Sequence, residues 1–136
     1  MKYYFSTTPA GSFDEVIART VLALKSEGFG ILTDIDVGKT LQEKIGAAFR
    51  RYRILGACNP QLAYEALQSE DKIGTMLPCN VVVQELPDGR VEVAAIDPVA
   101  SMLAVDNSRL KTAAGQVAER LKRVIAQLEE TGTKQQ

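Results

Sequence analysis

The chain has 136 residues, 46% of them hydrophobic and 24% charged, which is typical of one globular domain that folds without a metal, cofactor or disulfide. The net charge of −1 gives no field for a phosphate backbone, and no segment approaches the roughly 18 apolar residues that cross a bilayer, so neither nucleic acid nor a membrane is an expected partner. Because histidine is absent, Ser-His-Asp triads, Cys-His dyads and HExxH zinc sites are excluded within this chain.

The first strand and helix are marked by their ends. The aromatic and β-branched segment 2–8, "KYYFSTT", predicts a strand that stops before Pro9. Ser12 and Glu15 have the spacing of a capping box, and an apolar stripe with helical periodicity follows as far as Gly28. We therefore expect a helix between these two signals.

A second strand and a short helix come next. Segment 29–36, "FGILTDID", predicts a strand. Thr40 and Glu43 repeat the capping-box spacing, which predicts a helix over residues 40–49. The apolar face of this helix would consist of Leu41, Ile45 and Phe49.

The third strand is predicted at 52–58, "YRILGAC", and runs directly into a helix start. Asn59 is a good N-cap, and Pro60 suits the first helical position. Segment 61–67 then has the apolar spacing of a short helix, which the polar stretch that follows would end.

Two further strands form a predicted hairpin at 80–86 and 91–97, joined by a turn in which Gly89 can take a positive φ. The Asp97-Pro98 step would break the second of these strands before an apolar connector or helical turn.

Residues 108–128 have the periodicity of a long amphipathic helix. The predicted organisation is one domain over residues 1–128, with a frayed tail at 129–136. The hairpin, the alternating strands and the single long closing helix predict an α+β fold with an antiparallel β-sheet backed by helices on one face.

The two cysteines share a Cys-Asn step, with Cys58 at the end of one predicted strand and Cys79 at the start of the next. If these strands pair antiparallel, we expect the thiols to be neighbours. Cys58 also precedes the Asn59 cap, where the positive end of a helix dipole would lower its pKa. These thiols are therefore candidates for a nucleophile or for soft-metal ligands.

A structural role explains the same cysteines, because free cysteine often fills apolar space. Cys79 shares strand parity with Val81 and Val83, which predicts that it faces the core. A permanent disulfide is not expected, since the chain is expected to be cytoplasmic, where thiols stay reduced. Two sulfurs are too few for a closed zinc site, although four could assemble across a dimer axis.

Two clusters of charge have simple alternatives to a ligand site. Asp34, Asp36 and Glu43 could surround a hard cation, but strand ends and helix caps account for them. The basic residues could hold an anion, but such side chains more often solvate a helix or strand end. They are Lys44, Arg50, Arg51 and Arg53.

Five segments carry a family resemblance, in the order "DVGKTLQEKIG", "YRILGACNPQLAYEAL", "IGTMLPCNVVVQE", "DGRVEV" and "AIDP". Over nearly its whole length the chain resembles the bacterial family known as domain of unknown function 302. The resemblance implies a TATA-binding-protein-like β-α-β4-α arrangement and a homodimer, and assigns no roles, because the family's activity is unassigned. The matching hallmark positions are Gly56, Cys58, Asn59, Pro60, Leu77, Pro78, Cys79, Asn80 and Asp97.

Three functional hypotheses remain open. In the first, a small cytoplasmic module binds a small ligand or a soft metal at the end of the sheet that carries Cys58 and Cys79, with Asn59 and Asn80 as polar contacts and Asp97 as a charge. In the second, Cys58 attacks and Cys79 resolves in a thiol redox enzyme. In the third, both cysteines are structural and the domain binds proteins. Standard enzyme motifs are missing, which favours a non-enzyme. The candidate ligand-binding residues are Gly56, Cys58, Asn59, Pro60, Pro78, Cys79, Asn80 and Asp97.

Overall fold

The computed structural model describes residues 2–134 and the side chains of residues 2–129. In this part of the chain, five antiparallel strands form one sheet in the order β1-β5-β4-β3-β2. The strands are β1 (Tyr4–Thr7), β2 (Gly30–Asp36), β3 (Tyr52–Cys58), β4 (Cys79–Glu85) and β5 (Val91–Ile96). The helices are α1 (Phe13–Ser26), α2 (Val37–Ile45), α3 (Pro60–Ser69), the 3-10 helix η1 (Asp71–Met76), α4 (Pro98–Ser101) and α5 (Ser108–Lys134).

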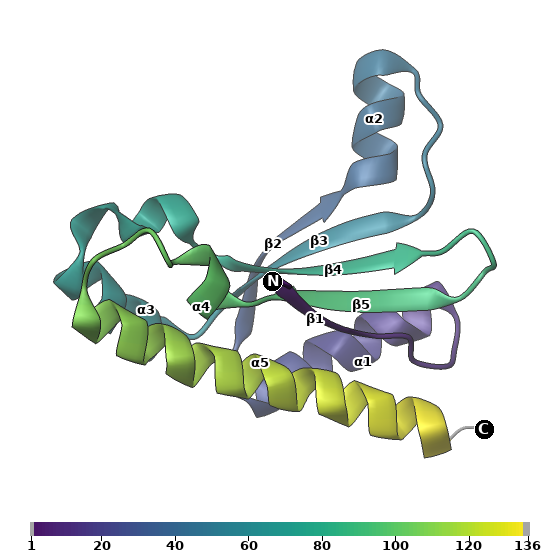
Figure 1. Ribbon diagram of the computed structural model, residues 1–136. Helices are drawn as coiled ribbons and strands as arrows, with labels where there is room; N and C mark the ends of the chain where they lie inside the picture. Colours follow the sequence, from purple (N-terminus) through teal and green to yellow (C-terminus); the bar gives the residue numbers. More distant parts are fainter. Residues whose placement is uncertain (1, 135–136) are drawn as a thin grey trace.

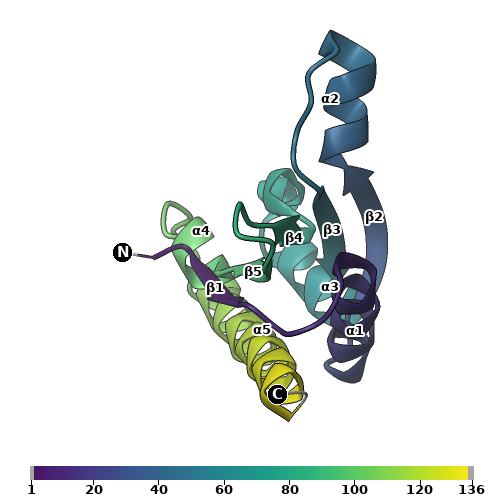
Figure 2. The same cartoon turned by 90° about the vertical axis from the view of Figure 1, so that its right-hand side faces the viewer.

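Helices α1 and α5 cover one face of the sheet, here called the covered face, while α2 stands on the opposite side (Figures 1 and 2). The predicted α+β class, with an antiparallel sheet, helices packed on it and a long C-terminal helix, is confirmed, although α2 stands apart from the helices of the covered face. None of the helices within residues 2–134 combines the length and the hydropathy that a membrane span requires.

The main core lies between the covered face and these two helices. Alternate residues of the central strands point into it, among them Val81 and Val93, which are fully buried. They belong to one cluster with Leu24 of α1 and Leu121 of α5. Each side chain of this kind stabilises the fold by about 1.5–3 kcal/mol.

A second cluster lies apart from the main core, beneath α3, η1 and α4 and against the first half of α5. Its buried members are Ala66, Ile73, Met102, Leu110 and Ala114. Because α5 continues into the main core, this one helix joins the two clusters.

Several local signals act as predicted. Ser12 and Glu15 form the capping box of α1. Gly28 has φ 86° just after that helix, and Gly89 has φ 89° in the turn of the hairpin. Cys79 is 8% exposed and faces the core together with Val81, as its strand parity indicates.

The limits of α2 differ from the prediction. The helix begins at Val37, because the Asp36 side chain accepts a hydrogen bond from the backbone N–H of Lys39, 3.0 Å away. It ends at Gly46, whose φ of 65° stops a helix. Thr40 and Glu43 therefore lie inside the helix rather than at its start, and Phe49 lies beyond its end.

The observed secondary structure differs from the prediction in two further segments. The polar stretch after α3 contains η1, which buries Ile73 to 2% exposure. Helix α5 continues to Lys134, beyond the predicted helix end at Leu128, and residues 135–136 of the tail predicted to be frayed lie outside the described residues.

The edge strand β2 has a β-bulge at Leu32, between the pairs Ile31–Ala57 and Thr33–Gly56. Leu32 is 66% exposed.

Candidate functional site

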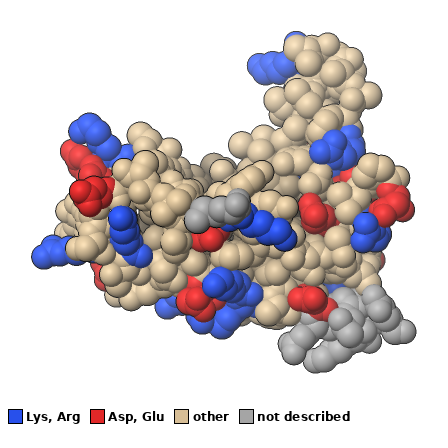
Figure 3. Space-filling model, viewed as in Figure 1, with Lys and Arg blue, Asp and Glu red and all other residues tan. Residues whose placement is uncertain are grey.

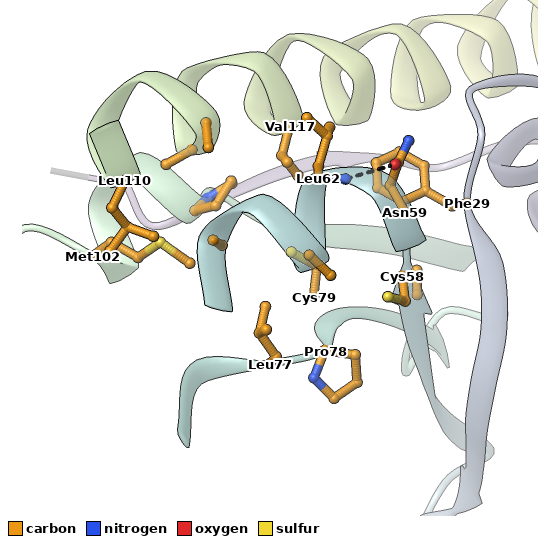
Figure 4. Close-up of a pocket in the computed structure, with 16 residues that line it drawn as sticks. Phe29, Cys58, Asn59, Leu62, Leu77, Pro78, Cys79, Met102, Leu110 and Val117 are labelled. Atoms are coloured by element: carbon orange, nitrogen blue, oxygen red, sulfur yellow. Dashed lines mark hydrogen bonds between the residues drawn. The ribbon is translucent and has the colours of Figure 1, made fainter. Parts of the chain in front are cut away.

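A cavity of about 40 Å³ lies where β3 ends and β4 begins, beneath α3 and the first half of α5 (Figure 4). It lies at the junction of the two clusters, since its lining includes Ala57 and Cys79 from the main core and Met102 and Leu110 from the second cluster. The full lining is Phe29, Ala57, Cys58, Asn59, Leu62, Ala63, Ala66, Leu77, Pro78, Cys79, Pro98, Met102, Leu110, Ala113, Ala114 and Val117.

The chain path at the end of β3 creates this cavity. Asn59 caps α3 as predicted, with its Oδ1 accepting from the backbone N–H of Leu62 at 3.2 Å, and Pro60 occupies the first turn. Helix α3 therefore starts directly after β3, and the chain turns back over that end of the sheet. The lining residues of α3 and α5 include several alanines, which leave space that larger side chains would fill.

The expectation that the two thiols are neighbours is wrong. Strands β3 and β4 do pair antiparallel, but the residue opposite Cys79 is Ala57, so Cys58 lies one position further along. Successive side chains of a strand point to opposite faces, and the two sulfurs are therefore not near each other although both line the cavity. In this conformation they cannot form a disulfide or share one metal ion.

The expectation of an activated thiol is also wrong. Burial raises the pKa of the Cys58 thiol, opposite to the expected lowering. Burial, with a smaller contribution from the charge of Cys58, raises the pKa of the Cys79 thiol to about 11. Neither group is a thiolate near neutral pH, so the geometry does not support the thiol redox hypothesis.

The raised pKa of Cys79 predicts a loss of stability in alkali. Between pH 9.0, the ordinary thiol value, and about 11, the unfolded chain releases this proton while the folded protein retains it. The unfolded state then binds fewer protons, so the free energy of unfolding, unaffected below pH 9, falls by about 2–3 kcal/mol as pH rises to 11. Urea unfolding of wild type and Cys79→Ala across this range isolates the effect as the difference between the two curves. Parallel curves would show that Cys79 ionises as readily in the folded protein as in the unfolded chain.

Gly56 has a packing role beside the cavity. A Cβ on this residue would lie 2.1 Å from Oγ1 of Thr33 and 2.7 Å from Cγ of Pro78. Pro78, which follows a cis peptide bond, thus packs over the glycine as well as lining the cavity.

Asn80 and Asp97 do not line the cavity. Asn80 pairs with Gly56 and points to the face of the sheet opposite α1 and α5, where it lines a separate groove with Tyr4 and Tyr52. Asp97 caps α4 by accepting from the backbone N–H of Val99 at 3.0 Å. The expected polar and charged contacts from these two residues are therefore absent from the cavity lining.

Ion pairs within the chain account for members of both charged clusters. Asp34 forms an ion pair with Arg53, whose hydrogen bonds lower the pKa of that carboxyl group. Arg51 pairs with Asp14 at 2.8 Å. Among the residues that the structure describes, no group of three or more Cys, Asp or Glu side chains is arranged to hold a metal ion.

The sequence predicts eight residues in one site, and four of them, Cys58, Asn59, Pro78 and Cys79, line the cavity, whereas Gly56, Pro60, Asn80 and Asp97 do not. The prediction missed the half of the lining that comes from distant segments, such as Met102 and Val117. Helical periodicity marked Val117 as an inward-facing residue of the long helix, but it gives no sign of where packing is incomplete.

The comparisons with known proteins agree with the fold. The model of the family described as "Domain of unknown function DUF302" matches residues 5–128, which confirms the resemblance expected from the sequence. The chain is also similar to the crystal structure of an uncharacterized conserved protein DUF302 from Bacillus stearothermophilus. That comparison has a TM-score of 0.84 and 28% sequence identity, and it covers 97% of this chain and 99% of the other. The search of curated proteins finds no match.

Proposed function

Since the chain belongs to the DUF302 family, whose description assigns no function, we propose a function from its own cavity: it binds a small, largely apolar ligand between α3, α5 and the ends of β3 and β4. The observation that carries the proposal is that four predicted site residues line one cavity together with mostly apolar side chains. Those four residues are Cys58, Asn59, Pro78 and Cys79.

The lining indicates the class of ligand. The Oδ1 of Asn59 is already used in capping α3, and its Nδ2 lies beside Gly28, where a Cβ would be only 2.8 Å from it. The protonated thiols and the thioether of Met102 are weakly polar and polarisable. An alkyl chain end suits these surroundings better than an ion or a sugar.

The volume indicates the ligand's size. About 40 Å³ exceeds the roughly 10–15 Å³ needed for one water molecule but is well below the roughly 150 Å³ of a cavity that binds benzene. At this volume the cavity admits only the end of an alkyl chain. Because the second cluster is separate from the main core, we expect a longer ligand to move α3 and η1 away from the sheet and enlarge the cavity while most of the main core stays packed.

Straight-chain alcohols from ethanol to octanol test this proposal. We expect saturable NMR shifts of the methyl groups of Met102, Leu110 and Val117, with affinity rising about fourfold for each added CH₂ until the cavity is full. Ala63→Leu, which fills the cavity, should weaken binding of the longer alcohols by about tenfold or more.

Ala18→Leu is the matched control, because Ala18 is exposed on α1 and does not line the cavity. This variant should bind the alcohols as wild type does. Shifts that do not saturate, or equal affinities in the two variants, would count against the proposal. Cys58→Ala should retain binding, since the sulfur acts as lining here rather than as a ligand.

A further inference from the structure

The chain contains an arm with no core of its own. This arm, residues 37–51, consists of α2 and the loop that leads into β3. Helix α2 has no buried residue, although Val37, Leu41 and Ile45 form an apolar stripe along it. Ile45 is 72% exposed. Such a helix gains little from its own molecule and needs another apolar surface to bury its stripe.

The face of the sheet opposite α1 and α5, here called the open face, is such a surface. It carries a groove of about 330 Å³ whose lining includes Tyr4, Tyr52, Val82, Ala94 and Ile96. These side chains are only half-buried, because no helix packs on them within residues 2–134. Apolar side chains gathered and left partly exposed on one face of a sheet are typical of an interaction surface.

The arm stands on the open side of the sheet but away from the groove (Figures 1 and 2). Its base is held in place: the Arg50 guanidinium lies 4.3 Å from the ring centroid of Phe49 and donates to Oε1 of Gln84 at 2.9 Å. Figure 3 shows a hollow, mostly free of charged side chains, between the arm and the end of the molecule that α3, η1 and α4 form.

The arm of one copy and the groove of another match in length and charge. A nine-residue helix such as α2 is about 14 Å long, and the span across β3, β4, β5 and β1 is also about 14 Å. Within the strands, Glu92 is the one charged side chain whose parity places it on the open face. The stripe of α2 is likewise uncharged, and helical spacing places Lys44 beside it, which suits an acidic neighbour.

We propose that the occupant of the open face is a second copy of this chain, and that the two copies exchange arms, each α2 lying in the groove of the other. With a two-fold axis, the arm and the open face of each copy are both buried against the other copy, and the assembly stops at a dimer. The arm and the open face together provide about the 20–30 residues per side that a stable interface uses. The inference rests on surfaces separate from the cavity and is independent of the ligand proposed above. It specifies the surface of the homodimer that the family resemblance implies.

Two charge substitutions test the arrangement by sedimentation and light scattering. Wild type should be a dimer at micromolar concentration. Ile45→Lys on the arm and Val82→Glu on the open face should each raise the dimer dissociation constant by at least about a hundredfold, because each places two charges in apolar surroundings. Leu22→Lys is the matched control: Leu22 is 65% exposed on α1, on the other side of the sheet, and this variant should remain a dimer.

Mixing the two variants gives the decisive result. In a heterodimer the arm with the Ile45→Lys change would lie on the open face with the Val82→Glu change, so the two new charges have opposite signs and meet. The other arm and face are unchanged, and the mixture should therefore form dimers that neither variant forms alone. Thermal unfolding of each variant verifies that it is folded. A monomeric wild type, dimers that persist in both variants, or folded monomers that do not associate on mixing would each overturn the proposal.

Discussion

Gly56→Ala is expected to destabilise the fold by about 2–3 kcal/mol, the usual cost of overpacking a close contact. Ordinarily alanine in place of a glycine stabilises slightly, because it restricts the unfolded chain. At this position the new Cβ would lie 2.1 Å from Oγ1 of Thr33 and 2.7 Å from Cγ of Pro78, so one neighbour must move. Urea unfolding of the variant measures the loss.

Gly30→Ala provides the matched control. Gly30 lies in the adjacent strand β2, and a Cβ there would meet no atom within 4 Å. Its stability should stay within about 0.5 kcal/mol of wild type. Adding Thr33→Ala to Gly56→Ala should restore about 1 kcal/mol, since it removes one of the two close contacts. Equal stabilities for Gly56→Ala and Gly30→Ala would show that Thr33 and Pro78 do not restrict this site.

Leu110→Ala is expected to cost about 2–4 kcal/mol, because Leu110 is 1% exposed at the centre of the second cluster. The cluster is separate from the main core, so the loss should be local. Amide hydrogen exchange should accelerate in α3, η1 and α4, while β4 and β5 retain most of their protection.

Leu103→Ala is the control for this variant, since Leu103 is close in sequence but 55% exposed. It should change exchange little anywhere. If Leu110→Ala instead accelerated exchange equally in the central strands, the two clusters would unfold as one unit and α3 could not open independently over the cavity.

Elements with a signal at each end were predictable from the sequence. Ser12, Glu15 and Gly28 define α1, and Gly89 defines the hairpin, because each of these residues acts on backbone within a few positions of itself. The start of α2 was misplaced because Asp36 and Thr40 are both competent N-caps, and local sequence does not rank them.

The candidate site was predictable only in part. Asn59 and Pro60 determine the turn at the end of β3, which brings Cys58 and Cys79 to one cavity. Whether their sulfurs meet depends on the register of two strands, and an offset of one residue changes the face to which a side chain points. Registers are fixed by tertiary packing, so residue types alone could not settle this point.

The bulge at Leu32 has a consequence for aggregation. Strand β2 is an edge of the sheet, with the apolar residues Leu32 and Ile35 exposed, a composition that in a flat strand invites further chains to add laterally. The bulge interrupts the regular row of N–H and C=O groups that an incoming strand would need, and Asp34 and Asp36 add charge beside it. This edge is therefore a poor template for fibril growth.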